Sequence, residues 1–209
     1  MRYILAAFAA AFLSAAVPAA QSDALVAPGA EIEKEDFFKP RIAPQIAPRG
    51  FNLTIVYFMD YACPQCRRYT PDVERVIRED RRIRWIYRDI PSISSKSRDA
   101  SRVAIAAQWQ NRHHAFHRAL MMSPGRLTDA NIRAAANKVG LNWARLQRDI
   151  KLRGKEIDRQ IERNIELADA AGMPGTPAFI IGERQSNGAL DYDGLMAEIA
   201  DARRELRKR

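Results

Sequence analysis

The sequence contains only two cysteines among its 209 residues. So few thiols exclude a disulfide scaffold and a four-thiolate zinc site. The 10 glycines and 11 prolines exclude a collagen-like or low-complexity chain. The chain also lacks an internal repeat, a Gly-rich phosphate loop and a serine nucleophile elbow. Because 47% of the residues are hydrophobic, a chain of this length can bury a core, which excludes disorder of the whole chain.

Long hydrophobic runs are scarce, and the longest lies at the N-terminus, over residues 3–17 after Arg2. This run is shorter than the about 20 residues that a membrane span needs. The small residues Val17 and Ala19 then form a cleavage pattern. Residues 1–20 are therefore predicted to be a signal peptide, with an uncleaved anchor as the alternative. We expect the mature chain in the periplasm, where disulfides can form and persist.

Basic residues exceed acidic ones, with 34 Lys and Arg against 25 Asp and Glu. Removal of Arg2 with the signal peptide leaves 33 minus 25, or +8. The basic residues are interspersed with acidic ones, except for a C-terminal run of Arg203, Arg204, Arg207, Lys208 and Arg209. Cations in the last turn of a helix suit its dipole, so we expect a solvated helix end and no nucleic-acid partner. Attraction to an anionic membrane surface is the weaker alternative.

The first half of the mature chain has the pattern of a strand, a helix and a strand. Residues 21–51 hold acidic side chains and then prolines, which predicts an extended lead-in. The run Leu53–Met59 is continuously apolar and β-prone, as in a central strand buried on both faces. Helical spacing continues to Asp80, and Ile83–Asp89 alternates like a second strand. A helical connection of this kind makes the two strands parallel.

A long helical region is predicted over residues 97–171, with Thr128 and Asn142 as helix caps. It separates two segments, residues 52–96 and 172–209, that both contain strands. We therefore predict an α/β fold in which these two segments form one domain and residues 97–171 form an inserted helical domain.

The C-terminal segment is predicted to complete the sheet. Strand character returns at Ala178–Ile181, and Asn187 with Gly188 suggests a hairpin turn. Tyr192–Leu206 has the apolar spacing of a closing amphipathic helix. The order along the chain is thus βαβ, a helical block, and ββα.

The two cysteines form a CPQC motif, with Cys63 at the end of the predicted strand and Cys66 one turn inside the helix that follows. Unpaired backbone N–H groups and the helix dipole stabilise a thiolate at Cys63, so its pKa is expected to be depressed. Pro64 fits the first helical turn, where its missing N–H costs little. Cys63 would form a mixed disulfide with a partner, and Cys66 would resolve it. A structural disulfide and half of a metal site are the alternatives.

A second element, GMPGTPAF, places Thr176 and Pro177 directly before the returning strand. An X-Pro bond can be cis at modest cost, and it then presents backbone polar groups that can pair with a peptide. An ordinary turn is the alternative, since spacing does not show whether Pro177 is cis or near Cys63.

Three motifs together resemble the DsbA-like thiol:disulfide oxidoreductases: CPQC at 63–66, FHRALM at 116–121 and GTPAF at 175–179. The resemblance runs from about Leu53 to Arg203. It implies a thioredoxin fold with an inserted helical domain and a Cys63–Cys66 disulfide. It also implies roles for particular residues: Cys63 as nucleophile, Cys66 as buried partner, Pro64 and Gln65 as the dipeptide that tunes the potential, Pro177 as a cis proline facing the cysteines, and Thr176 as a substrate contact.

The sequence departs from that family at several positions. Gln65 stands where the best-known oxidants carry His, which implies a weaker oxidant. Thr176 is similar to the residue of disulfide isomerases, but residues 21–51 are too short to supply the dimerisation domain of those enzymes. Tyr57 replaces the buried acid found six residues before the first cysteine in many relatives. Asp60 is the nearest acid, for proton transfer or for a helix-entry hydrogen bond.

Histidines and methionines in the helical region suggest a metal site only weakly. His113 and His117 are one helical turn apart and His114 lies between them, but no carboxylate or cysteine matches their spacing. Met121 and Met122 could join imidazoles in a Cu(I) site. We expect packing roles for these residues, with no metal and no cofactor.

Taken together, these features predict a monomeric, exported oxidoreductase that exchanges disulfides with folding proteins as an oxidant. A membrane thiol oxidoreductase would recycle its dithiol. The alternatives are a periplasmic reductase or isomerase, and a non-enzymatic copper-binding protein that uses the CPQC thiolates as a clamp.

Overall fold

The computed structural model describes residues 32–208, so the predicted signal peptide lies outside the described residues. The helices are α1 (Pro64–Glu79), α2 (Ser97–Ala107), α3 (His113–Met121), α4 (Asp129–Lys138), α5 (Trp143–Ala170) and α6 (Tyr192–Leu206), with short 3-10 helices η1 (Lys34–Phe38) and η2 (Gln108–Gln110). The strands are β1 (Gln45–Ile46), β2 (Leu53–Met59), β3 (Ile83–Asp89), β4 (Ala178–Ile181) and β5 (Arg184–Asn187). Among these described helices, none is long and apolar enough to cross a membrane.

The strands form one sheet in the order β1-β3-β2-β4-β5. β2 lies at its centre and pairs in parallel with β3, from Leu53 opposite Ile83 to Met59 opposite Asp89. β4 runs antiparallel to β2, and β5 runs antiparallel to β4. This arrangement confirms the predicted α/β fold, with βαβ and ββα units joined by helices. The continuous apolar run of β2 has the expected cause, because helices cover both faces of the central strand.

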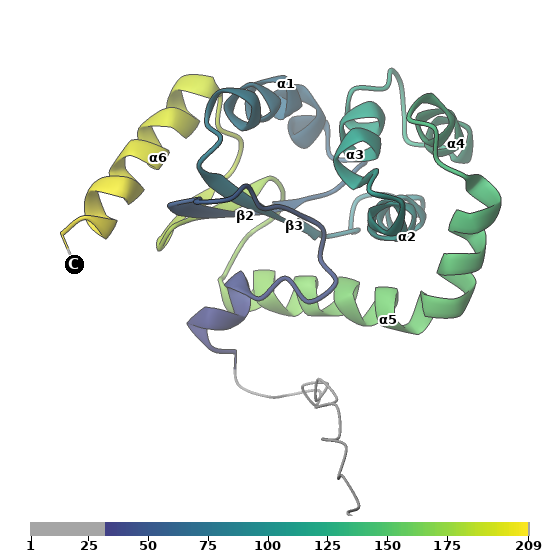
Figure 1. Ribbon diagram of the computed structural model, residues 1–209, viewed down its shortest axis with the longest axis horizontal. Helices are drawn as coiled ribbons and strands as arrows, with labels where there is room; N and C mark the ends of the chain where they lie inside the picture. The colour runs from purple at the N-terminus through teal and green to yellow at the C-terminus, as the bar shows by residue number, and fades with distance from the viewer. Residues whose placement is uncertain (1–31, 209) are drawn as a thin grey trace, which may run out of the picture. The chain divides into compact units, whose positions relative to one another are not determined.

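Alternate side chains of β2 enter two different cores. Ile55 and Tyr57 point to the face that α1, α3 and α6 cover, whereas Val56 and Phe58 meet the C-terminal half of α5. Figure 1 shows α1 and α3 on one side of the sheet and α5 on the other. The helical insertion is thus packed into the same cores as the sheet, so its helices help to hold the strand that leads to the cysteines.

The helix boundaries follow local chemistry. The Thr128 hydroxyl caps α4 by accepting from the N–H of Asn131 at 3.2 Å. The Asn142 side chain caps α5 by accepting from the N–H of Arg145 at 2.9 Å. Both predicted caps are therefore confirmed.

The lead-in is more structured than the predicted extended segment. Part of it folds into η1, and another part, β1, pairs antiparallel with β3 at the sheet edge. Arg88 of β3 holds the η1 segment, because its side chain is fully buried and donates to the carbonyls of Phe37 (3.0 Å) and Lys39 (2.8 Å) and to Oδ1 of Asn164 (3.2 Å). A buried guanidinium needs hydrogen-bond partners, and here carbonyls of the lead-in and the Asn164 side chain accept from its two terminal nitrogens, while its Nε has no partner among the described residues.

The hairpin turn was predicted at Asn187 and Gly188, and this prediction is wrong. The turn between β4 and β5 is Gly182–Glu183, and Asn187 is the last residue of β5. Gly182 has a φ of +61°, and a Cβ there would lie 3.3 Å from a methyl carbon of Leu53. Glycine is therefore required at the turn both by backbone conformation and by close packing. Gly188 also has a positive φ, of +92°, but it follows the hairpin.

Candidate active site

Cys63 and Cys66 lie where β2 passes into α1. Cys63 is the N-cap residue, and its sulfur accepts a hydrogen bond from the N–H of Cys66 at 3.2 Å. Pro64 occupies the first turn, where a missing N–H is tolerated. Both cysteines are free thiols, so the structure describes the dithiol form. Cys63 is 2% exposed and Cys66 is fully buried.

The surroundings of Cys63 favour its thiolate. A hydrogen bond from the Cys66 side chain lowers the pKa of Cys63 to about 6, helped by the N–H groups of Cys66 and Gln65 and opposed by burial. The first turn of α1 contains no acidic residue, so no carboxylate opposes the positive end of the helix dipole. Cys63 is therefore largely a thiolate at neutral pH, as the motif predicted.

Cys66 has the opposite electrostatic character. Burial raises the pKa of Cys66 far above its ordinary value, and its hydrogen bond to Cys63 acts in the same direction. The thiolate is the reactive form of cysteine. The two sulfurs are therefore chemically distinct: Cys63 can attack a partner, while Cys66 stays protonated until a disulfide is made or broken.

The chain brings Thr176 to the cysteines across 113 residues of sequence. The Cys63 sulfur lies 3.2 Å from the Thr176 carbonyl oxygen, to which it donates when protonated, and the Thr176–Pro177 peptide bond is cis. Pro177 is buried, whereas Thr176, Pro64 and Gln65 are partly or fully exposed. The residues that the resemblance assigned to this site thus lie around Cys63.

Asp60, the residue after β2, is buried, and its carboxylate accepts four hydrogen bonds. The donors are the N–H groups of Ala62 (2.7 Å), Ser92 (2.9 Å) and Ile93 (2.9 Å) and the hydroxyl of Ser97 (2.6 Å). The donors lie just before α1 and before or at the start of α2, so this hydrogen-bond network does not cap α1. It joins the end of β2 to the start of α2. The proton-transfer role of Asp60 stays a prediction.

A buried cluster of tyrosines and histidines lies beneath the cysteines, on the sheet face covered by α1 and α3. His117 Nδ1 lies 3.3 Å from the Tyr61 hydroxyl, and the His117 ring lies 4.8 Å from the ring of Tyr87. Burial lowers the pKa of His117 to about 3 and that of His113 well below its ordinary value. Both imidazoles are therefore neutral packing groups. Within residues 32–208, no cluster of three or more His, Cys, Asp or Glu side chains could hold a metal.

Arg67, which no sequence motif singled out, ties the site to the helical insertion. Its guanidinium donates to the Tyr61 carbonyl at 3.2 Å, and to both the carbonyl and the hydroxyl of Ser123 in the α3–α4 loop. No sequence pattern pointed to this contact, because the partners are 56 residues apart.

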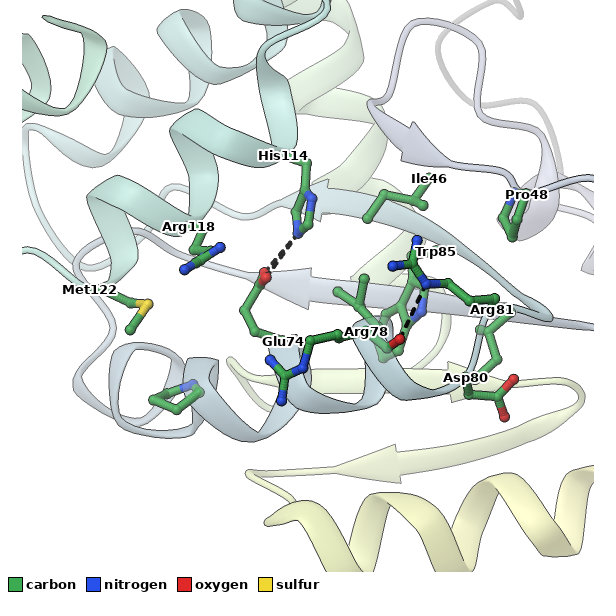
Figure 2. Close-up of a pocket in the computed structure, with 13 residues that line it drawn as sticks. Ile46, Pro48, Glu74, Arg78, Asp80, Arg81, Trp85, His114, Arg118 and Met122 are labelled. Atoms are coloured by element: carbon green, nitrogen blue, oxygen red, sulfur yellow. Dashed lines mark hydrogen bonds and ion pairs between the residues drawn. The ribbon is translucent and has the colours of Figure 1, made fainter. Parts of the chain in front are cut away.

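A groove of about 430 Å³ lies farther along α1, between that helix, α3, β1 and β3. Figure 2 shows Glu74 and His114 facing each other across it, with their side chains 2.9 Å apart. Arg78, Arg81 and Arg118 also line it. Neither cysteine is among its lining residues, so thiol chemistry takes place outside this groove.

Residues 52–201 match the protein family described as Thioredoxin. The chain belongs to the thioredoxin family. The match begins just before β2 and includes the CPQC motif, Pro177 and most of α6, so it covers the whole site described above.

Solved structures similar to this chain include thioredoxin-like proteins and a thiol-disulfide exchange protein. A thioredoxin-like oxidoreductase from Silicibacter pomeroyi is 31% identical, with a TM-score of 0.77 over 83% of this chain and 99% of that chain. The thiol-disulfide exchange protein alpha-DsbA2 from Wolbachia pipientis is 25% identical, with a TM-score of 0.75 over 80% and 90%. A periplasmic thioredoxin-like protein from Salmonella enterica is 27% identical, with a TM-score of 0.70 over 83% and 99%. These likenesses confirm the DsbA-like resemblance.

Curated relatives of the thioredoxin-family segment include much longer proteins. The Na(+)/H(+) antiporter NhaA 1 of Salinispora arenicola is 26% identical over 157 residues, which are 74% of this chain. The NhaA 3 antiporter of Salinispora tropica is 24% identical over the same length. The chain spans about a quarter of the length of these relatives, or 24% in both cases.

Proposed function

We propose that this chain is an exported oxidant that passes its Cys63–Cys66 disulfide to folding proteins in the periplasm. The observation that carries the proposal is the hydrogen-bonded, low-pKa sulfur of Cys63 beside a buried Cys66. Stabilisation of the Cys63 thiolate favours the dithiol form, and a favoured dithiol makes the disulfide a stronger oxidant. Neutral Gln65 supplies no charge to this thiolate, so we expect a weaker oxidant than enzymes with a histidine there.

The proposed location rests on two features. Residues 1–20 have the charge, apolar run and small-residue end of a signal peptide. A structural neighbour is described as a periplasmic thioredoxin-like protein. In that compartment a dithiol oxidant must be reoxidised, so we propose a membrane thiol oxidoreductase as its second partner.

The proposed substrate surface surrounds Cys63. Thr176 offers backbone beside the nucleophile, and Gln65 is exposed at the start of α1. An extended substrate segment would pair with backbone near Thr176, which gives affinity with little sequence selectivity. Such weak selectivity suits an enzyme that serves many folding proteins. We propose that the chain acts as a monomer.

The copper-clamp alternative has less support from the side chains near the cysteines. His113 and His117 are buried against tyrosine rings, and Met121 is 1% exposed. Only Met122 is exposed, at 52%. Because His113, His117 and Met121 are buried in the core while Met122 is exposed, these side chains do not favour a shared Cu(I) site.

Trapping of mixed disulfides tests the proposed roles. Cys66→Ala in the full chain should accumulate mixed disulfides through Cys63, visible as larger species that collapse on reduction. Cys63→Ala should trap few, because Cys66 is fully buried. Equal trapping by both variants would contradict the assigned roles.

Direction is tested with the oxidised protein and a reduced, unfolded test protein. An oxidant forms disulfides in the test protein as its own disulfide is consumed. If the oxidised protein leaves the thiols intact while its dithiol form resolves mispaired disulfides, the reductase or isomerase alternative is correct.

A further inference from the structure

The turn that leads from β2 to Cys63 is held on both sides by one residue, Asp60. Its backbone carbonyl accepts from the N–H of Cys63 at 3.0 Å, and its side-chain Oδ1 accepts from the N–H of Ala62 at 2.7 Å. A side chain that accepts from the N–H two residues later forms an Asx turn, which fixes the bend of the backbone. The direction in which the chain enters Cys63 therefore depends on Asp60.

The same carboxylate is anchored to two other segments of the chain. Oδ2 accepts from the N–H groups of Ser92 and Ile93, both at 2.9 Å, and Oδ1 also accepts from the hydroxyl of Ser97 at 2.6 Å. Ser97 is the first residue of α2. The turn before Cys63 is thus tied to the loop after β3 and to the start of the helical insertion.

The hydrogen-bond partners of Asp60 match an ionised carboxylate. Asp60 is 1% exposed, and all four partners of its side chain are donors. A protonated carboxyl would need an acceptor for its own hydrogen, whereas a carboxylate only accepts. A buried charge is tolerated when donors surround it. Neither cysteine sulfur is among these donors, so the carboxylate reaches Cys63 through the backbone of the turn.

The placement of Cys63 decides which groups its sulfur meets. The sulfur accepts from the N–H of Cys66 at 3.2 Å and lies 3.2 Å from the carbonyl oxygen of Thr176. Hydrogen bonds weaken steeply once their distance and angle leave the normal range. A turn that rotated would carry the sulfur away from the start of α1, where N–H groups and the helix dipole stabilise its thiolate.

We propose that Asp60 is a positioning residue: its side-chain hydrogen bond to the N–H of Ala62 holds the turn so that the Cys63 sulfur stays aligned with the start of α1. The proposal rests on the proposed function only in that Cys63 is the attacking sulfur, and not on the direction of exchange. An aligned thiolate is the form of Cys63 that attacks a substrate disulfide.

The test compares Asp60→Ala with Asp60→Asn in the full chain. Both substitutions remove the negative charge, but only asparagine keeps a side-chain oxygen that can accept from the N–H of Ala62. The readout is the pH midpoint of the Cys63 thiolate in the dithiol form, measured by ultraviolet absorbance. Asp60→Ala should raise this midpoint by at least about one pH unit, which makes the thiol about tenfold less acidic, and Asp60→Asn should raise it by less than about half a unit.

The direction of the shift separates positioning from the charge of Asp60. A negative charge near a thiol raises the pKa of that thiol, so loss of the charge alone would lower the midpoint in both variants. Ser97→Ala is the matched control, because it removes one donor to the same carboxylate and leaves the turn intact. Its midpoint should stay within about 0.3 unit of the unaltered chain. An unchanged or lowered midpoint in Asp60→Ala, or an equal shift in Asp60→Asn or Ser97→Ala, would overturn the proposal.

Thermal unfolding of each dithiol variant shows whether it is folded. If Asp60→Ala does not fold, amide hydrogen exchange in the unaltered chain decides the matter. The amide hydrogens of Ala62 and Cys63 should exchange at least about a hundredfold more slowly than in the unfolded chain, because both are bonded to Asp60. Exchange of the Ala62 amide at the rate of the unfolded chain would show that its bond does not hold the turn, and would overturn the proposal.

Failure of the proposed function would give a different result. If the unaltered chain titrates near pH 6 with the expected split between Asp60→Ala and Asp60→Asn, the positioning role of Asp60 is supported. Absence of mixed disulfides in Cys66→Ala would then contradict disulfide exchange through Cys63 and leave that positioning role in place.

Discussion

Two thiols separated by two residues acquire different chemistry because only one sulfur receives hydrogen bonds at the start of a helix. Cys63 accepts from the N–H of Cys66, while Cys66 lies in the core with almost no access to water. The CPQC motif alone predicted that the pKa of Cys63 is lowered, because the apolar strand Leu53–Met59 ends shortly before the motif and a helix begins within it.

The acidity of Cys63 gives a prediction at this scale. The ultraviolet absorbance of the dithiol protein should show one thiolate that titrates near pH 6. Cys63→Ser should abolish this transition, whereas Cys66→Ser should leave a thiolate transition in place. Loss of the Cys66 donor should move that transition to higher pH, because the Cys66 side chain is the largest cause of the lowered pKa. A wild-type transition near pH 8.5, the value of a free cysteine, would refute the picture.

The lowered pKa of Cys63 also makes the stability of the dithiol form depend on pH. A thiol whose pKa is lower in the folded chain stabilises that chain at high pH, fully so above the unfolded thiol's pKa of about 8.5. The stabilisation is lost as the pH falls through about 6. Urea unfolding of the dithiol form should therefore show stability that declines from pH 8 to pH 5 more steeply than in Cys63→Ser. Parallel profiles for the two proteins would contradict the linkage.

Among the elements, the catalytic helix and the helical insertion are joined by Arg67. Its guanidinium bridges the Tyr61 carbonyl and Ser123, and burial lowers the pKa of this arginine. The bridge holds the α3–α4 loop beside the first turns of α1. It is therefore a local clamp between two parts of the chain that the sequence shows as separate segments.

Removal of this clamp gives a prediction for the elements. Arg67→Ala should lower the free energy of unfolding by about 1 to 3 kcal/mol, because it leaves carbonyl groups without their donors. The matched control is Arg68→Ala, whose exposed side chain lies over the Tyr69 ring, and its loss should stay within about 0.5 kcal/mol. Urea unfolding measures both. Equal losses in the two variants would show that Arg67 is an ordinary surface side chain.

Elements with local causes were predictable from sequence, and those with distant causes were not. The central strand, the helix caps and the helix start at Cys63 depend on neighbouring residues, and the structure has them as expected. The η1 segment is held by Arg88, whose carbonyl acceptors Phe37 and Lys39 are 51 and 49 residues away, and β1 is held by its pairing with β3. The hairpin turn was misplaced because Asn187–Gly188 has turn composition, whereas packing against Leu53 selects Gly182.

For the whole molecule, the sheet, the insertion and the cis Thr176–Pro177 segment converge on one recessed sulfur. Substrate access, thiolate stabilisation and burial of the resolving thiol are thus properties of the folded domain. The four residues of the CPQC motif do not determine them by themselves. The central claim is that this arrangement favours the dithiol strongly enough to make the chain an oxidant.

Equilibration of the Cys63–Cys66 couple with a glutathione redox buffer tests this claim most directly. The fraction of dithiol at each buffer ratio gives the reduction potential of the pair. A stabilised Cys63 thiolate without a histidine at Gln65 predicts a value between about −120 and −180 mV, the range from DsbA to protein disulfide isomerase. A value between about −230 and −270 mV, near that of thioredoxin, would contradict the oxidant account and assign the chain to reduction.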